Sequence, residues 1–124
     1  MSTQSAPVLP ERYTLAGASY ATQPASPARC LALFSAIQNV DLPVAQIYAA
    51  ALALTSQSAG VPWKPGGVLA WSEAVFDAFV KKGVKLSPDF FDQGRVAWEW
   101  VKNQIPFEKE VKEAEDFSGA PQGG

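Results

Sequence analysis

The chain has 124 residues, of which 48% are hydrophobic and 11% are aromatic, and its formal net charge at pH 7 is −2. This length suffices for one hydrophobic core without disulfides or metal ions. The balance of 10 basic and 12 acidic residues argues against an electrostatic nucleic-acid binder, which needs a surface of clustered Lys and Arg. The composition therefore predicts one small globular domain and no nucleic-acid partner.

Cysteine usage and the apolar runs predict a cytoplasmic protein that does not associate with membranes. Cys30 is the sole cysteine, which excludes an intrachain disulfide framework and is typical of a reducing compartment. Residues 1–12, MSTQSAPVLPER, lack the basic and apolar regions of a secretory signal. The longest apolar stretch covers residues 47–54, whereas a membrane-spanning helix needs about 20 residues.

Residues 12–24, RYTLAGASYATQP, predict a β-hairpin. The glycine at position 17 supplies the backbone conformation that a tight turn needs. An irregular arm lying over the helices is the alternative for this stretch. Because a lone hairpin is marginal in water, the predicted hairpin must pack on the rest of the chain. The β-prone residues on either side of the turn are Tyr13, Leu15, Tyr20 and Thr22.

Two helices are predicted next. Ser26 is an N-cap followed by Pro27 at the first helical position, and this helix should stop near Asn39. A second helix should begin near Asp41 and Pro43 and end at Gly60 and Pro62. The first apolar face consists of Cys30, Leu33, Phe34 and Ile37, so the Cys30 thiol is predicted to be buried and inert. The second consists of Val44, Ile47, Tyr48, Ala51 and Leu52.

A third helix is predicted to follow Gly67 and to end at a Gly83 cap. A fourth starts at Ser87 and Pro88 and runs to about residue 103 before Pro106 breaks it. In the third helix the residues predicted to be buried are Leu69, Val75, Phe76, Phe79 and Val80, and Glu73, Asp77 and Lys81 form a polar stripe.

Together these elements predict a mainly α fold: a small bundle of about four helices preceded by a short N-terminal β-hairpin. Residues 1–10 are predicted to be a flexible N-terminus, and residues 11–106 a single helical domain that includes the hairpin. Residues 107–124 are predicted to be a charged and then flexible C-terminal tail.

The usual chemistry of enzymes is sparse in this sequence. There is no histidine, which removes the common general base and every Ser-His or Cys-His arrangement. One cysteine cannot form an all-cysteine zinc site. The pairs Glu73/Asp77 and Asp89/Asp92 leave a carboxylate-based enzyme open, but acidic residues also favour helix N-termini and exposed helix faces. We predict no catalytic residue, no cofactor and no metal site.

Tryptophan residues give the strongest indication of a binding surface. Trp100 lies about 200° around the fourth helix from Trp98, and Val96 lies beside Trp100. This second facet either packs on the hairpin or C-terminal segment, or contacts a protein partner, because Trp is enriched in interface hot spots. The main apolar arc holds Phe91, Gly94, Ala97, Trp98 and Val101. The candidate protein-binding residues are Trp100, Val96 and, in the VPWKPGG loop, Trp63.

Residues 12–37, RYTLAGASYATQPASPARCLALFSAI, resemble the start of the small tail assembly chaperones of long-tailed bacteriophages. That family's pattern is a short Tyr-Thr-Leu…Gly…Tyr hairpin, a polar or proline-containing step and a helix bundle. The resemblance implies a non-enzymatic protein that holds the tape-measure protein during tail assembly in the host cytoplasm and brings tail-tube subunits to it. It also implies a longer product made by ribosomal frameshifting. The matching residues are Tyr13, Thr14, Leu15, Gly17 and Tyr20.

Other functions stay open at this point. Another small phage structural or adaptor protein, such as a head–tail component, or a host-directed inhibitor would share the predicted fold. A carboxylate-based enzyme is the third alternative. The sequence predicts neither the identity of the partner nor the oligomeric state.

Overall fold

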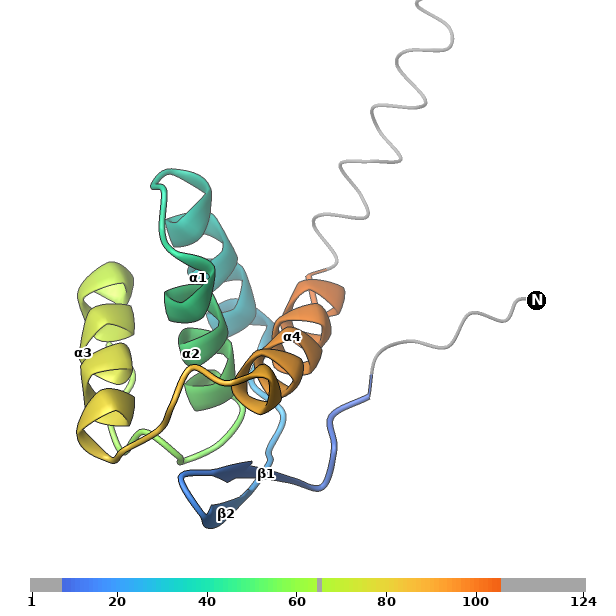
Figure 1. The fold of residues 1–124 in the computed structure, drawn as a ribbon. Coiled ribbons are helices and arrows are strands. Elements are labelled where there is room, and N and C mark those ends of the chain that lie inside the picture. Colours follow the sequence, from blue (N-terminus) through green and yellow to red (C-terminus); the bar gives the residue numbers. More distant parts are fainter. Residues whose placement is uncertain (1–7, 65, 106–124) are drawn as a thin grey trace, which may run out of the picture.

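The computed structural model describes residues 8–64 and 66–105, in which a two-stranded antiparallel hairpin precedes four helices (Figure 1). The predicted mainly α bundle with an N-terminal hairpin is confirmed. The predicted tail of residues 107–124 and most of the predicted N-terminal segment lie outside the described residues. The elements are β1 (Arg12–Leu15), β2 (Ala18–Ala21), α1 (Pro27–Gln38), α2 (Val44–Leu54), α3 (Val68–Lys81) and α4 (Pro88–Asn103).

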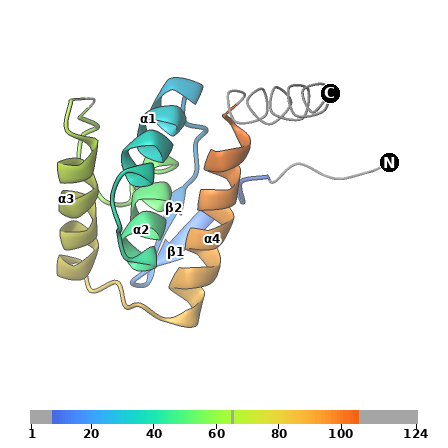
Figure 2. The ribbon, with the colours of Figure 1, turned by 90° about the horizontal axis from the view of Figure 1, so that it is seen from above.

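The hairpin turns through Ala16 and Gly17, which have φ angles of 53° and 79°. Positive φ at both central residues is what a two-residue turn of the twisted hairpin type requires. The register pairs Tyr13 with Tyr20, and Tyr13 and Leu15 point into the core. The predicted hairpin therefore packs on the helices by the alternate residues of β1 (Figure 2).

Specific hydrogen bonds hold this hairpin against α2 and α4. The Tyr13 hydroxyl lies 2.7 Å from Oγ1 of Thr55, which itself donates to the Ala51 carbonyl oxygen at 2.9 Å. The Gln93 side chain of α4 accepts from the Thr14 amide at 2.8 Å and donates to the Thr14 carbonyl oxygen at 2.9 Å. Two helices thus stabilise a hairpin that would be marginal alone.

Helix α2 lies at the centre of the bundle, between α3 and α4 (Figure 1). Its small residues Ala49, Ala50 and Ala51 are fully buried, and they let neighbouring backbones come close. A Cβ atom built on Gly94 of α4 would lie 2.4 Å from Cβ of Tyr48. The absence of a side chain at position 94 is therefore what allows α4 to lie directly on α2.

The two predicted serine caps are present. Oγ of Ser26 accepts from the Arg29 amide at 3.2 Å, and Oγ of Ser87 accepts from the Phe90 amide at 3.3 Å. Gly83 has a φ of 87°, which suits its predicted position after α3. None of the helices in residues 8–64 and 66–105 is long and apolar enough to cross a membrane.

The predicted end of the second helix was wrong. Helix α2 ends at Leu54 rather than near Gly60, because hydroxyl groups after it satisfy its last carbonyl groups. Ser56 donates to the Leu52 carbonyl oxygen at 2.7 Å, beside the Thr55 bond to Ala51. These short side chains compete with further backbone turns.

The predicted burial of α3 was also partly wrong. Leu69 and Val80 are 37% and 55% exposed, whereas Trp71 is only 2% exposed. The buried side follows Trp71, Val75 and Phe79 at four-residue spacing, and Leu69 and Val80 lie roughly a third of a turn away from it. On α2, Val44 is likewise 53% exposed, because it begins the helix at the bundle's edge.

Replacing Gly94 by Ala is expected to lower the free energy of unfolding by about 1–3 kcal/mol, since overpacking against Tyr48 outweighs alanine's better helix propensity. Urea denaturation measures the change. Gly66→Ala is the matched control, because a Cβ there meets no atom within 4 Å. A Gly94→Ala protein as stable as the parent would contradict the close α2–α4 approach.

Cys30 is fully buried, and burial raises the pKa of its thiol to about 11. Because the thiolate is the reactive form, a thiol reagent at pH 8 should label the native protein slowly and the urea-unfolded protein at the rate of a free cysteine. Absorbance of the released chromophore follows both reactions. Rapid labelling without denaturant would show that the core side of α1 is open to solvent.

Candidate protein-binding site

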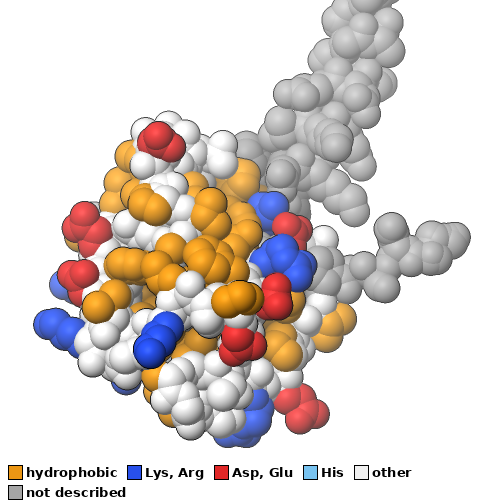
Figure 3. Space-filling view, viewed as in Figure 1, with side chains coloured by type: hydrophobic (Ala, Val, Ile, Leu, Met, Phe, Trp, Pro, Cys, Tyr) orange, Lys and Arg blue, Asp and Glu red, His pale blue; other side chains and the backbone are white. Residues whose placement is uncertain are grey.

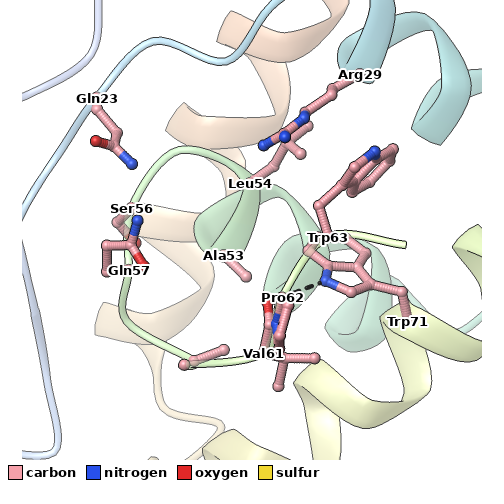
Figure 4. Close-up of a pocket in the computed structure, with 12 residues that line it drawn as sticks. Gln23, Arg29, Ala53, Leu54, Ser56, Gln57, Val61, Pro62, Trp63 and Trp71 are labelled. Carbon is pink, nitrogen blue, oxygen red and sulfur yellow. Dashed lines mark hydrogen bonds between the residues drawn. The ribbon is translucent and has the colours of Figure 1, made fainter. Parts of the chain in front are cut away.

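A groove of about 350 Å³ opens where the start of α1, the end of α2 and the loop before α3 meet (Figure 4). Helix α2 ends at Leu54, and the segment that follows it, residues 56–63, supplies most of the lining of the groove. Trp63, one of the sequence-predicted binding residues, forms part of its wall. The lining residues that matter below are Gln23, Arg29, Leu54, Gln57, Trp63 and Trp71. We call this the Trp63 groove.

Trp71 provides a fixed base for Trp63. The two rings meet edge to face, with 5.0 Å between centroids and an interplanar angle of 71°. The Trp71 indole N–H donates to the Val61 carbonyl oxygen at 3.2 Å, and this bond fixes the orientation of its ring. Trp63 is only half-buried and therefore presents an aromatic surface to the groove.

Arg29 adds a positive charge above this aromatic surface. Its guanidinium carbon lies 5.5 Å from the centroid of the Trp63 ring, within the range of a cation–π contact. Within residues 8–64 and 66–105, the ion pairs join Arg95 to Asp92 and Lys102 to Glu99, and Arg29 has no carboxylate within ion-pair distance. The charge of Arg29 is therefore available to a bound group.

Gln23 and Gln57 lie across the groove from Trp63 (Figure 4). Their amides add donors and acceptors to a wall that also contains apolar surface from Leu54. In the described part of the chain, no three His, Cys, Asp or Glu side chains lie close enough together to hold a metal ion. The groove thus combines an aromatic ring, a cation and neutral amides, a set suited to recognition.

Trp100 and Val96 lie elsewhere, on α4. Trp100 is 9% exposed and belongs to the core, and Val96 is half-buried. Gln93, two helical turns before Trp100 and on the same side of α4, holds the backbone of β1. Packing within the fold, the first alternative for this facet, accounts for the burial of Trp100. A partner contact for Trp100 and Val96 stays a prediction.

The main arc of α4 also differs from the prediction at two residues, Phe91 and Trp98. Phe90 is buried, whereas Phe91 is half-buried and meets Tyr48 at a centroid distance of 6.0 Å. Trp98 is half-buried and stacks on Phe34 at 6.2 Å. Phe91 and Trp98 therefore line the border of the core, on the opposite side of α4 from Trp100.

Arg29 and Trp71 were not predicted as site residues. The sequence does indicate that Trp71 lies on the buried side of α3, because it stands four residues before Val75 and eight before Phe79. No pattern in the sequence indicates that Arg29 belongs to the site, because its contact with Trp63 brings together two segments that are far apart in the sequence.

Hydrophobic side chains also remain exposed on α2 and α3. Figure 3 shows them gathered over α2, between α3 and α4. Val44 and Val80 are each more than half exposed. Half-buried Tyr48 and Phe76 belong to the same two helices. We call these apolar residues of the two helices, Val44, Tyr48, Leu69, Phe76 and Val80, the exposed apolar set. Exposed apolar surface that gathers on one face, as Figure 3 shows over α2, is typical of interaction sites in soluble proteins.

Comparisons with protein-family models, curated proteins and solved structures find no match to this chain. Its function must therefore be inferred from the residues themselves.

Trp100→Ala is expected to lower the free energy of unfolding by about 3–5 kcal/mol, the range for removing a buried aromatic side chain. Trp63→Ala removes the same atoms from a half-buried position, so it should lower the free energy of unfolding by a clearly smaller amount. Urea denaturation of both variants gives the comparison. Equal losses would mean that Trp100 is not the more deeply packed ring.

Proposed function

We propose that this protein is a non-enzymatic protein-binding module that acts as a tail assembly chaperone of a long-tailed phage in the host cytoplasm. Its partner is an apolar helical stretch of the tape-measure protein, and tail-tube subunits are brought to it. The observation that carries the binding role is the exposed apolar set on α2 and α3. The resemblance of residues 12–37 to such chaperones narrows the role to tail assembly.

The exposed apolar set suits a partner that is itself an amphipathic helix. Such helices bind by laying their apolar face along an apolar surface between helices. Val44 and Val80 add little to the core, because more than half of each side chain contacts solvent. Covering them with a partner would remove apolar surface from water, which favours association.

The carboxylates favour this proposal over a carboxylate-based enzyme. Asp89 lies in the first turn of α4, where a negative charge is favourable, and its Oδ2 accepts from Gln93 at 3.0 Å. Asp92 lies 3.8 Å from Arg95. Glu73 and Asp77 are exposed on α3. Each of these acids thus has a structural role or faces solvent.

The residues that carry the resemblance build the scaffold. Tyr13 anchors the hairpin to Thr55, Gly17 forms its turn, and the backbone of Thr14 is held by Gln93. Holding the hairpin to the helices is thus what these residues do in this fold, and the same role would account for the pattern in the chaperones that the stretch resembles.

Co-purification with the tape-measure protein tests the proposal. The neighbouring coding region should encode a very long helical protein, and that protein should co-purify with the parent chain. Val44→Asp and Val80→Asp should each weaken binding at least tenfold, because a charge would be buried in an apolar interface. Leu31→Asp, at an exposed position on α1, is the matched control.

Thermal melts establish that each variant is folded before binding is compared. Unchanged binding by both Asp variants would rule out the exposed apolar set as the contact surface. If the folded parent protein does not bind the tape-measure protein but binds a head–tail protein or a host protein, that alternative replaces the chaperone proposal.

A further inference from the structure

We infer that the Trp63 groove binds an acidic side chain, Glu or Asp, of a peptide segment that places an apolar residue next to it. The inference does not depend on the chaperone proposal, since the groove lies at the C-terminal end of α2 and the exposed residue Val44 begins that helix. It assigns a second and chemically different contact to the protein.

The cation of the groove is arranged to receive a carboxylate. Arg29 lies against Trp63, and a guanidinium that packs on an aromatic ring keeps its N–H donors free for a partner. This contact also restricts the long Arg side chain before any ligand arrives, which lowers the entropy cost of binding. No Asp or Glu lines the groove among the described residues, so none of the described carboxylates competes with a ligand for Arg29.

One positive charge matches one carboxylate. Phosphate groups carry up to two negative charges and are usually held by several cations or by backbone amides at a helix start. At the start of α1 the Arg29 amide is already bonded to Ser26, and Arg29 is the only basic residue that lines the groove in the described part of the chain. Gln23 and Gln57 offer neutral donors to the second carboxylate oxygen.

The rest of the groove is suited to an adjacent apolar side chain. Leu54, Val61 and Pro62 line it together with the exposed surface of Trp63. A volume of about 350 Å³ is at the lower end for small-molecule sites and is enough for a short run of peptide side chains. Trp and Arg are both enriched in interface hot spots.

The test uses the full chain and blocked peptides. The probe is Ac-Gly-Leu-Glu-Phe-Gly-NH2, titrated while the tryptophan indole N–H signals are followed by NMR. The Trp63 and Trp71 signals should shift and saturate. The peptide with Gln in place of Glu should bind at least fivefold more weakly, and raising the salt concentration should reduce that difference.

Arg29→Gln should abolish the preference for Glu over Gln while the variant keeps its fold. Arg95→Gln is the control, because it removes the same charge from an exposed position of α4 outside the groove. Val44→Asp should bind the peptide like the parent, which separates this site from the surface used in the chaperone proposal.

Three outcomes would overturn the inference. One is the absence of saturable shifts at Trp63 with the Glu peptide at about 10 mM, well above a 1 mM dissociation constant. Another is an equal affinity for the Glu and Gln peptides. The third is tighter binding of Ac-Gly-Leu-Phe with a free C-terminus, which would assign the groove to a terminal carboxylate instead of an acidic side chain.

Discussion

The contact between Gly94 and Tyr48 sets the arrangement of the bundle. Because Gly94 has no side chain, α4 lies directly on α2, whose buried alanines accept close neighbours. The position of α4 on α2 also determines what the two sides of α4 contact. One flank brings Trp98 onto Phe34 of α1, and the other brings Gln93 to β1. The hairpin and α1 thus depend on a helix approach that one glycine permits.

A second constraint links the hairpin to the Trp63 groove. Tyr13 reaches Thr55 at the end of α2, where hydroxyl groups stop the helix. The backbone N–H of Gln23 then donates to the Thr55 carbonyl oxygen at 2.9 Å. The loop that follows is therefore anchored at its first residues and leads to Trp63 against Trp71. Tyr13 of the hairpin is thus bonded to the residue at which this loop begins.

Local signals in the sequence were sufficient for most of the elements. Ser26 with Pro27 and Ser87 with Pro88 act within one helical turn, so the helix starts followed from neighbouring residues alone. The end of α2 did not follow from them. The hydroxyl groups of Thr55 and Ser56 bond to the last carbonyl groups of the helix, whereas Gly60 and Pro62, the usual residues that end a helix, stand several positions later. The exposed side of α3 and the Arg29–Trp63 contact depend on which helices pack together. Residue spacing within one helix does not contain that information.

The bonds from Gln93 to Thr14 have a consequence for self-association. Thr14 lies on the outer edge of a two-stranded sheet, where an unpaired N–H and C=O would be a template for a strand of another molecule. The side-chain amide of Gln93 bonds to both the N–H and the C=O of Thr14, as a third strand would. Unlike a third strand, it leaves no new row of unpaired backbone groups. One side chain on α4 thus closes this part of the sheet to the addition of a strand from another molecule.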